Sequence, residues 1–106
     1  MALLLFVRAK PYQAKQDINY CQVYGSIYIE SNIEMADYSI FIQPEEAFAD
    51  LVAYKTDDAL YASANGLWYI TNQKAFADHI IYFSTTESNA DFSVYFTDNE
   101  SFVGCK

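Results

Sequence analysis

A thirteen-residue repeat constrains the fold of this chain more than any other feature of the sequence. Alanine followed by aspartate recurs at four places, and a fifth copy carries an amide instead: Ala36-Asp37, Ala49-Asp50, Ala77-Asp78, Ala90-Asp91 and Ala64-Asn65. Val23-Tyr24 and Val103-Gly104 are degenerate copies in the same phase. We call the second member of each pair the anchor, which places anchors at positions 24, 37, 50, 65, 78, 91 and 104. Each step is thirteen residues except one of fifteen after residue 50, so the sequence predicts about seven copies of one structural unit.

Each unit has the composition of one β-strand followed by a turn. Four residues after the first six anchors stand aromatic side chains: Tyr28, Phe41, Tyr54, Tyr69, Tyr82 and Tyr95. Six residues after the same anchors stand polar side chains: Glu30, Gln43, Thr56, Thr71, Ser84 and Thr97. Runs of β-branched and aromatic residues closed by polar turn formers are typical of strands, and no segment has the spacing of a long amphipathic helix. We predict six strands, a seventh candidate over residues 3–7, and a loop rather than a helical turn over residues 45–51, after Pro44.

Apolar side chains occupy both faces of most predicted strands. One face carries Ile40, Ile42, Trp68, Ile70, Ile81, Phe83, Val94 and Phe96. The other carries Phe41, Val52, Tyr54, Tyr69, Ile80, Tyr82 and Tyr95. A sheet with one solvated face would alternate apolar and polar residues, so we expect strands that wrap on each other. With 106 residues, 53% of them apolar, the chain is predicted to be one small all-β domain.

Several units together resemble a known family. The segments that carry the resemblance are Tyr24-Gly25-Ser26-Ile27-Tyr28, Ala36-Asp37-Tyr38, Phe48-Ala49-Asp50-Leu51-Val52, Gly66-Leu67-Trp68-Tyr69, Phe76-Ala77-Asp78-His79, Ala90-Asp91-Phe92-Ser93 and Gly104-Cys105. Over about residues 21–106 they resemble the septoil knot domain, a family of small bacterial β proteins. The resemblance implies a backbone tied into a torus knot with seven crossings, and it implies no known activity and no catalytic residues.

Residues 1–20 lie outside the resemblance and form a separate N-terminal segment. Residues 2–7 are six apolar residues in a row, which is shorter than the apolar region of a signal peptide, and no basic residue precedes them. They could be the remnant of an export leader or an edge strand. No apolar run approaches the roughly 20 residues that span a bilayer, so we expect no membrane insertion.

Two cysteines, Cys21 and Cys105, bracket the repeats. A disulfide between them would close a loop of about 85 residues and stabilise the fold by about 4–5 kcal/mol on the chain-entropy model. It would also indicate an oxidising compartment, so we expect a secreted, periplasmic or cell-envelope protein. The alternative is a pair of free thiols in the cytoplasm. Two cysteines and one histidine fall short of a structural zinc site.

The polar anchors have two interpretations. Asp37, Asp50, Asn65, Asp78 and Asp91 can be structural turn anchors, whose side chains accept hydrogen bonds from the backbone N–H groups of their own turns. A ladder of carboxylates could instead bind a cation. The amide of Asn65 favours the structural interpretation, since it would weaken a charged ligand set.

The charge and the single histidine bear on function. Fourteen acidic and six basic residues give a net charge of −8, which would repel the phosphates of nucleic acids and anionic membranes. His79 follows Asp78, but adjacent strand residues point to opposite faces, so the pair is no ready acid–base relay. No nucleophile or phosphate-binding motif is present. We therefore expect no enzymatic activity and no cofactor.

A structural or interaction domain of unknown biochemical function is our principal prediction, with a monomer as the default and the partner unknown. The alternative is a module that binds a carbohydrate, a peptide or Ca²⁺. Trp68, Tyr61 and Tyr69 could form an aromatic platform, although Trp68 also stands in phase with the predicted core. The acidic turns at residues 57–58 and 98–100 offer oxygen ligands for calcium, without the spacing of an established calcium loop.

Overall fold

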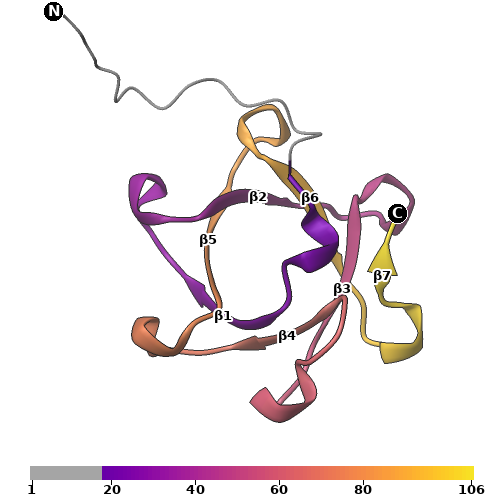
Figure 1. Cartoon of the computed structure of the whole chain (residues 1–106). Coiled ribbons are helices and arrows are strands. Elements are labelled where there is room, and N and C mark those ends of the chain that lie inside the picture. The colour runs from indigo at the N-terminus through magenta and orange to yellow at the C-terminus, as the bar shows by residue number, and fades with distance from the viewer. Residues whose placement is uncertain (1–17) are drawn as a thin grey trace, which may run out of the picture.

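The computed structural model describes residues 18–106 and shows seven strands joined by single turns of 3-10 helix (Figure 1). The strands are β1 (Gly25–Ile29), β2 (Tyr38–Ile42), β3 (Leu51–Lys55), β4 (Leu67–Ile70), β5 (His79–Ser84), β6 (Phe92–Phe96) and β7 (Gly104–Cys105). The turns are η3 (Tyr20–Gln22), η4 (Ile33–Met35), η5 (Glu46–Phe48), η6 (Ala59–Tyr61), η7 (Lys74–Phe76), η8 (Glu87–Asn89) and η9 (Glu100–Phe102). The all-β prediction is confirmed. Within residues 18–106 no helix is long and apolar enough to cross a membrane.

The six predicted strands are present, and each begins one or two residues after its anchor. The seventh strand of the structure is β7, which follows the degenerate anchor pair Val103-Gly104. The candidate strand at residues 3–7 lies outside the described residues. The loop predicted over residues 45–51 was wrong in part, because residues 46–48 form the 3-10 turn η5. Pro44 precedes that turn, so its missing N–H removes none of the turn's hydrogen bonds.

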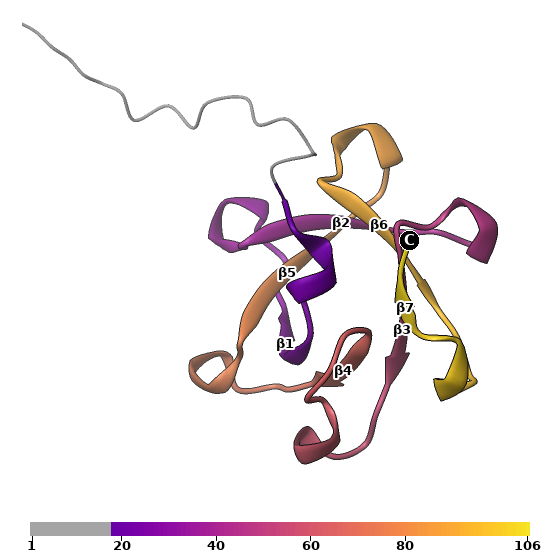
Figure 2. The same ribbon diagram turned by 45° about the vertical axis from the view of Figure 1, so that its right-hand side comes forward.

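The strands close into a ring in which almost every neighbour comes from a distant repeat. The sheet order is β4-β1-β5-β2-β6-β3-β7, and an additional pairing of β3 with β4 closes the six longer strands on themselves. These six strands are parallel to their neighbours, and β7 is antiparallel to β3. Most paired strands are three or four repeats apart. The chain therefore passes once around the ring in about three and a half repeats, and we call each such pass one circuit of the coil. Figures 1 and 2 show the strands around the centre of the ring and the 3-10 turns projecting outward.

The core follows the repeat. The residue three positions after each of the first six anchors has no exposed surface: Ile27, Ile40, Ala53, Trp68, Ile81 and Val94. Trp68 donates its indole Nε1–H to the backbone oxygen of Val23 at 2.8 Å, which satisfies the one polar group of this set. The second predicted face is less buried, because the aromatic residues four positions after the anchors are all only half-buried. The first predicted face is buried at these central positions but not throughout, because Ile42 and Ile70 are exposed at the ends of their strands, and Val52 is the buried exception on the second face.

Strand β2 offers a matched pair of isoleucines that tests this core. Ile40 is fully buried, whereas Ile42 is 44% exposed near the end of the same strand. We expect Ile40→Ala to lower the free energy of unfolding by about 2–5 kcal/mol, because it removes buried methyl groups and leaves a cavity. Ile42→Ala should cost less than about 1 kcal/mol. Urea denaturation of both variants measures the difference, and equal losses would contradict this account of the core.

Candidate functional site

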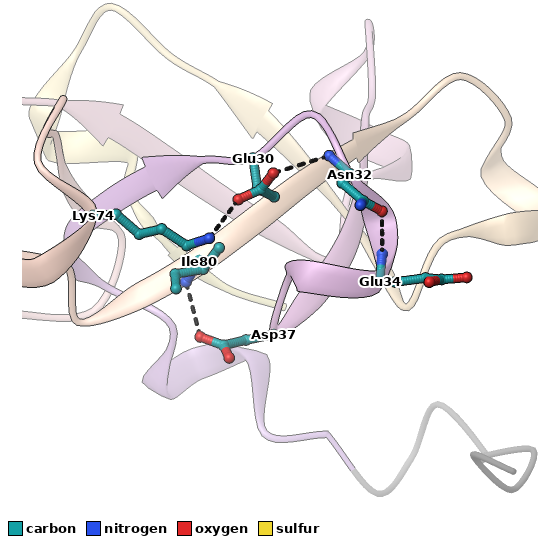
Figure 3. Close-up of polar contacts among 6 residues, drawn as sticks. All are labelled: Glu30, Asn32, Glu34, Asp37, Lys74 and Ile80. Atoms are coloured by element: carbon teal, nitrogen blue, oxygen red, sulfur yellow. Dashed lines mark hydrogen bonds and ion pairs between the residues drawn. The ribbon is translucent and has the colours of Figure 1, made fainter.

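The anchor aspartates hold the two circuits of the coil together. The N–H of Asp37 donates to the oxygen of Ile80 at 2.7 Å, and the N–H of Ile80 donates back to Asp37 Oδ2 at 2.8 Å (Figure 3). The same reciprocal pair of hydrogen bonds joins Asp50 to Ser93, Asp78 to Ser26 and Asp91 to Ser39. The partners are 43 or 52 residues apart in sequence. The donors are therefore not the N–H groups of the anchors' own turns, as the sequence analysis expected, but those of a strand on the other circuit.

Asn65 differs from the aspartate anchors because its side chain faces a sulfur atom and not a backbone N–H group. Its Nδ2 donates to Cys105 Sγ at 3.6 Å, and its Oδ1 is buried without a hydrogen-bond partner. A disulfide sulfur can only accept, so an amide N–H suits this position and a carboxylate would face no donor. The amide in the fifth alanine–anchor pair thus has a local structural cause.

Removing an anchor carboxylate should leave a strand N–H unpaired. We expect Asp91→Ala to lower the free energy of unfolding by about 1–3 kcal/mol, because the N–H of Ser39, a residue only 7% exposed, loses its acceptor. Asp98→Ala removes an exposed carboxylate and should change stability by less than about 0.5 kcal/mol. Chemical denaturation of both variants tests the role of the anchors. A loss for Asp91→Ala no larger than for Asp98→Ala would contradict it.

A disulfide joins the two ends of the repeat array. Cys21 in η3 and Cys105 in β7 are bonded, with their Cα atoms 5.3 Å apart and a separation of 84 positions in sequence. Beside this bond the hydroxyl of Tyr20 donates to the backbone oxygen of Lys106 at 3.2 Å. The predicted pairing of the two cysteines is confirmed, and it indicates an oxidising environment outside the cytoplasm.

The polar residue six positions after an anchor shapes the following turn. Glu30 Oε2 accepts the N–H of Asn32 at 3.1 Å, and Asn32 Oδ1 accepts the N–H of Glu34 at 3.0 Å (Figure 3). Thr56, Thr71, Ser84 and Thr97 accept the N–H two residues on in the same way. At Glu30 the other carboxylate oxygen pairs with Lys74 Nζ at 2.8 Å. This hydrogen bond from Lys74, helped by the N–H of Asn32, lowers the pKa of Glu30 below its usual value.

The lowered pKa of Glu30 makes part of the stability depend on pH. The stabilisation is fully present above the ordinary glutamate pKa of about 4.3, and it is lost as the pH falls through the lower pKa of the folded state. We expect wild type to be more stable than Lys74→Met at pH 7 and the difference to shrink as the pH falls below that range. Urea denaturation at neutral and strongly acidic pH measures this. A difference that stays constant across that range would show that the ion pair is not its source.

One cavity collects candidate residues that the sequence placed on separate turns. It has a volume of about 360 Å³ and is lined by Tyr54, Thr56, Asp57, Asp58, Tyr61, Leu67 and Glu100. Tyr61 ends η6 and is 67% exposed, while Glu100 begins η9. Asp58 Oδ1 accepts the N–H of Leu60 at 2.9 Å, which fixes this turn. The cavity thus combines an aromatic and aliphatic wall with carboxylates from two different turns.

A second cavity of about 270 Å³ is the repeat-equivalent of the first. It is lined by Glu46, Tyr95, Thr97, Asp98, Asn99 and Phe102. Five of these residues occupy the same repeat positions as Tyr54, Thr56, Asp57, Asp58 and Tyr61 in the first cavity. Each cavity also receives the first residue of a further 3-10 turn, Glu46 of η5 in the second and Glu100 of η9 in the first. Figures 1 and 2 show η5, η9 and η6 in succession around one side of the ring.

The three aromatic residues proposed as a platform do not lie together. Trp68 is fully buried, so it belongs to the core and cannot contact a ligand at the surface. Tyr69, the next residue along β4, points the other way, is half-buried and does not line the first cavity. Only Tyr61 of the three takes part in this site.

The other candidate residues are placed as follows. Among residues 18–106 no three Asp, Glu, His or Cys side chains gather in a group that could hold a metal ion. The carboxylate of Asp78 accepts the N–H of Ser26, while the His79 ring lies 5.9 Å from that of Tyr38. The neighbouring Asp78 and His79 are therefore engaged with different partners.

Apart from Tyr61, sequence reasoning missed the exposed apolar and aromatic residues that end the 3-10 turns. Five of these turns end in an apolar or aromatic residue that is more than half exposed: Met35, Phe48, Tyr61, Phe76 and Phe102. In all but Tyr61 the residue stands two positions before an anchor, so the repeat register contained the signal.

Comparison with known proteins gives one match. A family model, the 7(1) septoil knot domain, matches residues 20–106. No curated protein matches the chain.

Proposed function

Since this chain belongs to the septoil knot domain family, we propose that it is a durable, non-catalytic domain that displays interaction surfaces in an oxidising environment outside the cytoplasm. The observation that carries the proposal is the disulfide between Cys21 and Cys105, which fastens both ends of a closed ring of strands. A closed ring has few free strand edges at which another chain could pair or a protease could engage an extended segment. Durability of this kind suits a secreted, periplasmic or cell-envelope protein.

The interaction part of the proposal rests on the turns. The ring buries Trp68 and the aliphatic residues three positions after the other anchors, yet exposes Phe48 and Phe102 at separate corners. Exposed aromatic residues are common where one protein contacts another, because they bury large area at a small cost in side-chain entropy. The anchors and the core positions hold the ring, which leaves the turns free to differ from repeat to repeat.

The proposal predicts that the oxidised protein resists proteolysis. We expect wild type to survive prolonged digestion by a broad-specificity protease over residues 18–106. The double variant Cys21→Ser, Cys105→Ser should lose about 4–5 kcal/mol of stability, because its unfolded state regains the freedom of a long loop. It should be digested faster for that reason. Fragments analysed by mass spectrometry measure both effects, with reduced wild type as a second test of the bond.

Two results would overturn the scaffold proposal. The first is rapid digestion of the folded, oxidised protein within residues 18–106. The second is an unchanged unfolding midpoint in the double serine variant, which would mean that the ring needs no fastening at its ends.

A further inference from the structure

We propose that the side of the ring formed by η5, η9 and η6 binds lysine or arginine side chains of an extended basic peptide. This inference rests on the proposed interaction role and names its partner. The two cavities described above provide the contacts, one between η9 and η6 and the other between η5 and η9.

The first cavity has the chemistry that recognises a cation carried on an aliphatic stem. Tyr54 and Tyr61 offer aromatic rings and Leu67 offers an apolar wall. An ammonium or guanidinium group over an aromatic face is attracted by the ring quadrupole, while its stem packs on apolar surface. Asp57 and Glu100 supply negative charge to the cavity from two different turns.

The carboxylates of this cavity are not neutralised by lysines of the described chain. The one ion pair within residues 18–106 joins Glu30 to Lys74, on a different part of the ring. Lys55 lies on β3, but its Nζ sits over the ring of Phe96, 4.4 Å from the ring centroid. The net charge of −8 adds a long-range attraction for a basic partner and disfavours an acidic one.

The second cavity extends the site and indicates a ligand with more than one cation. Its Tyr95, Phe102 and Asp98 are the repeat equivalents of Tyr54, Tyr61 and Asp57, and Glu46 takes the place of Glu100. Lys106 Nζ donates to the backbone oxygen of Glu46 at 2.7 Å, so a lysine of the chain already lies at the η5 end. We therefore assign the first cavity as the principal site and the second as an auxiliary one. A peptide that reaches both gains affinity because its second contact becomes intramolecular.

The chain contains a matched neutral version of the site. After the anchor Asn65, the equivalent positions are Tyr69, Thr71, Asn72, Gln73 and Phe76. Phe76 is 71% exposed, close to the value for Tyr61, but its turn carries amides and Lys74 instead of aspartates. Phe76 is therefore the control residue for Tyr61.

The test is titration of the full-length oxidised protein with an acetylated and amidated lysine hexapeptide, followed by calorimetry. We expect binding that weakens as salt rises, and binding at least roughly tenfold tighter than that of a single blocked lysine. Tyr61→Ala should weaken peptide binding by about tenfold, and Tyr61→Phe should retain it, because the ring and not the hydroxyl makes the contact. Phe76→Ala should bind as wild type does. Asp57→Asn combined with Glu100→Gln should weaken binding and reduce its salt dependence.

Three results would overturn the inference. One is the absence of binding at millimolar peptide. Another is equal affinity of Tyr61→Ala and Phe76→Ala, which would show attraction to the overall charge rather than to the cavity. The last is equal affinity for a glutamate hexapeptide. Protease survival measured on the same samples separates the two proposals, because a resistant protein that binds no peptide leaves the scaffold role intact.

Discussion

The reciprocal hydrogen bonds between an anchor and a strand of the other circuit are the interaction on which the whole ring depends. The strands are short, and apart from the pairing of β3 with β4 each strand pairs with strands three or four repeats away. The anchor fixes the register of that pairing, because its own N–H and its carboxylate address the O and N of one residue such as Ile80. A slip by one residue would exchange the buried face for the outer face. Contacts this distant in sequence make closure entropically costly, so slow folding is the expected consequence.

The repeat register predicted six of the strands and much of the buried face, and the cysteines at its two ends suggested the disulfide, but the sequence did not predict the partners of the anchors. The pattern that identifies a strand is the same in every copy, so it cannot say whether Asp37 meets a residue of its own turn or Ile80. The 3-10 turns span three residues, too few for a helical periodicity to register. The cavity is lined by both Tyr61 and Glu100, whose turns become neighbours only once the ring has closed. The sequence allowed Trp68 to be a core residue or part of a binding platform, and its burial in the structure shows that it is a core residue.

Positions shared by the repeats build the ring, and the differences between repeats distinguish one side of it. The copy that begins at Asp50 has fifteen residues instead of thirteen, and its longer turn carries Tyr61 at the first cavity. Aspartates seven positions after the anchor occur only in this copy and the one that begins at Asp91. Within each repeat, the positions that hold the ring together are thus different from the exposed positions of the turn. A fold of this kind can change what it binds without changing what holds it together.

The disulfide also determines how the domain would respond to mechanical tension. If the chain is pulled from segments that flank Cys21 and Cys105, the load passes from one sulfur to the other. Residues 22–104 form a side loop to that path, so their hydrogen bonds carry none of the force. The ring would keep its shape under a pull that unravels an ordinary domain, because the distance between the two Cα atoms would stay close to 5.3 Å and almost no extension would be gained. Reduction of the disulfide would transfer the same load to the hydrogen bonds between the strands. The redox state of this one bond therefore decides whether the strands bear the force.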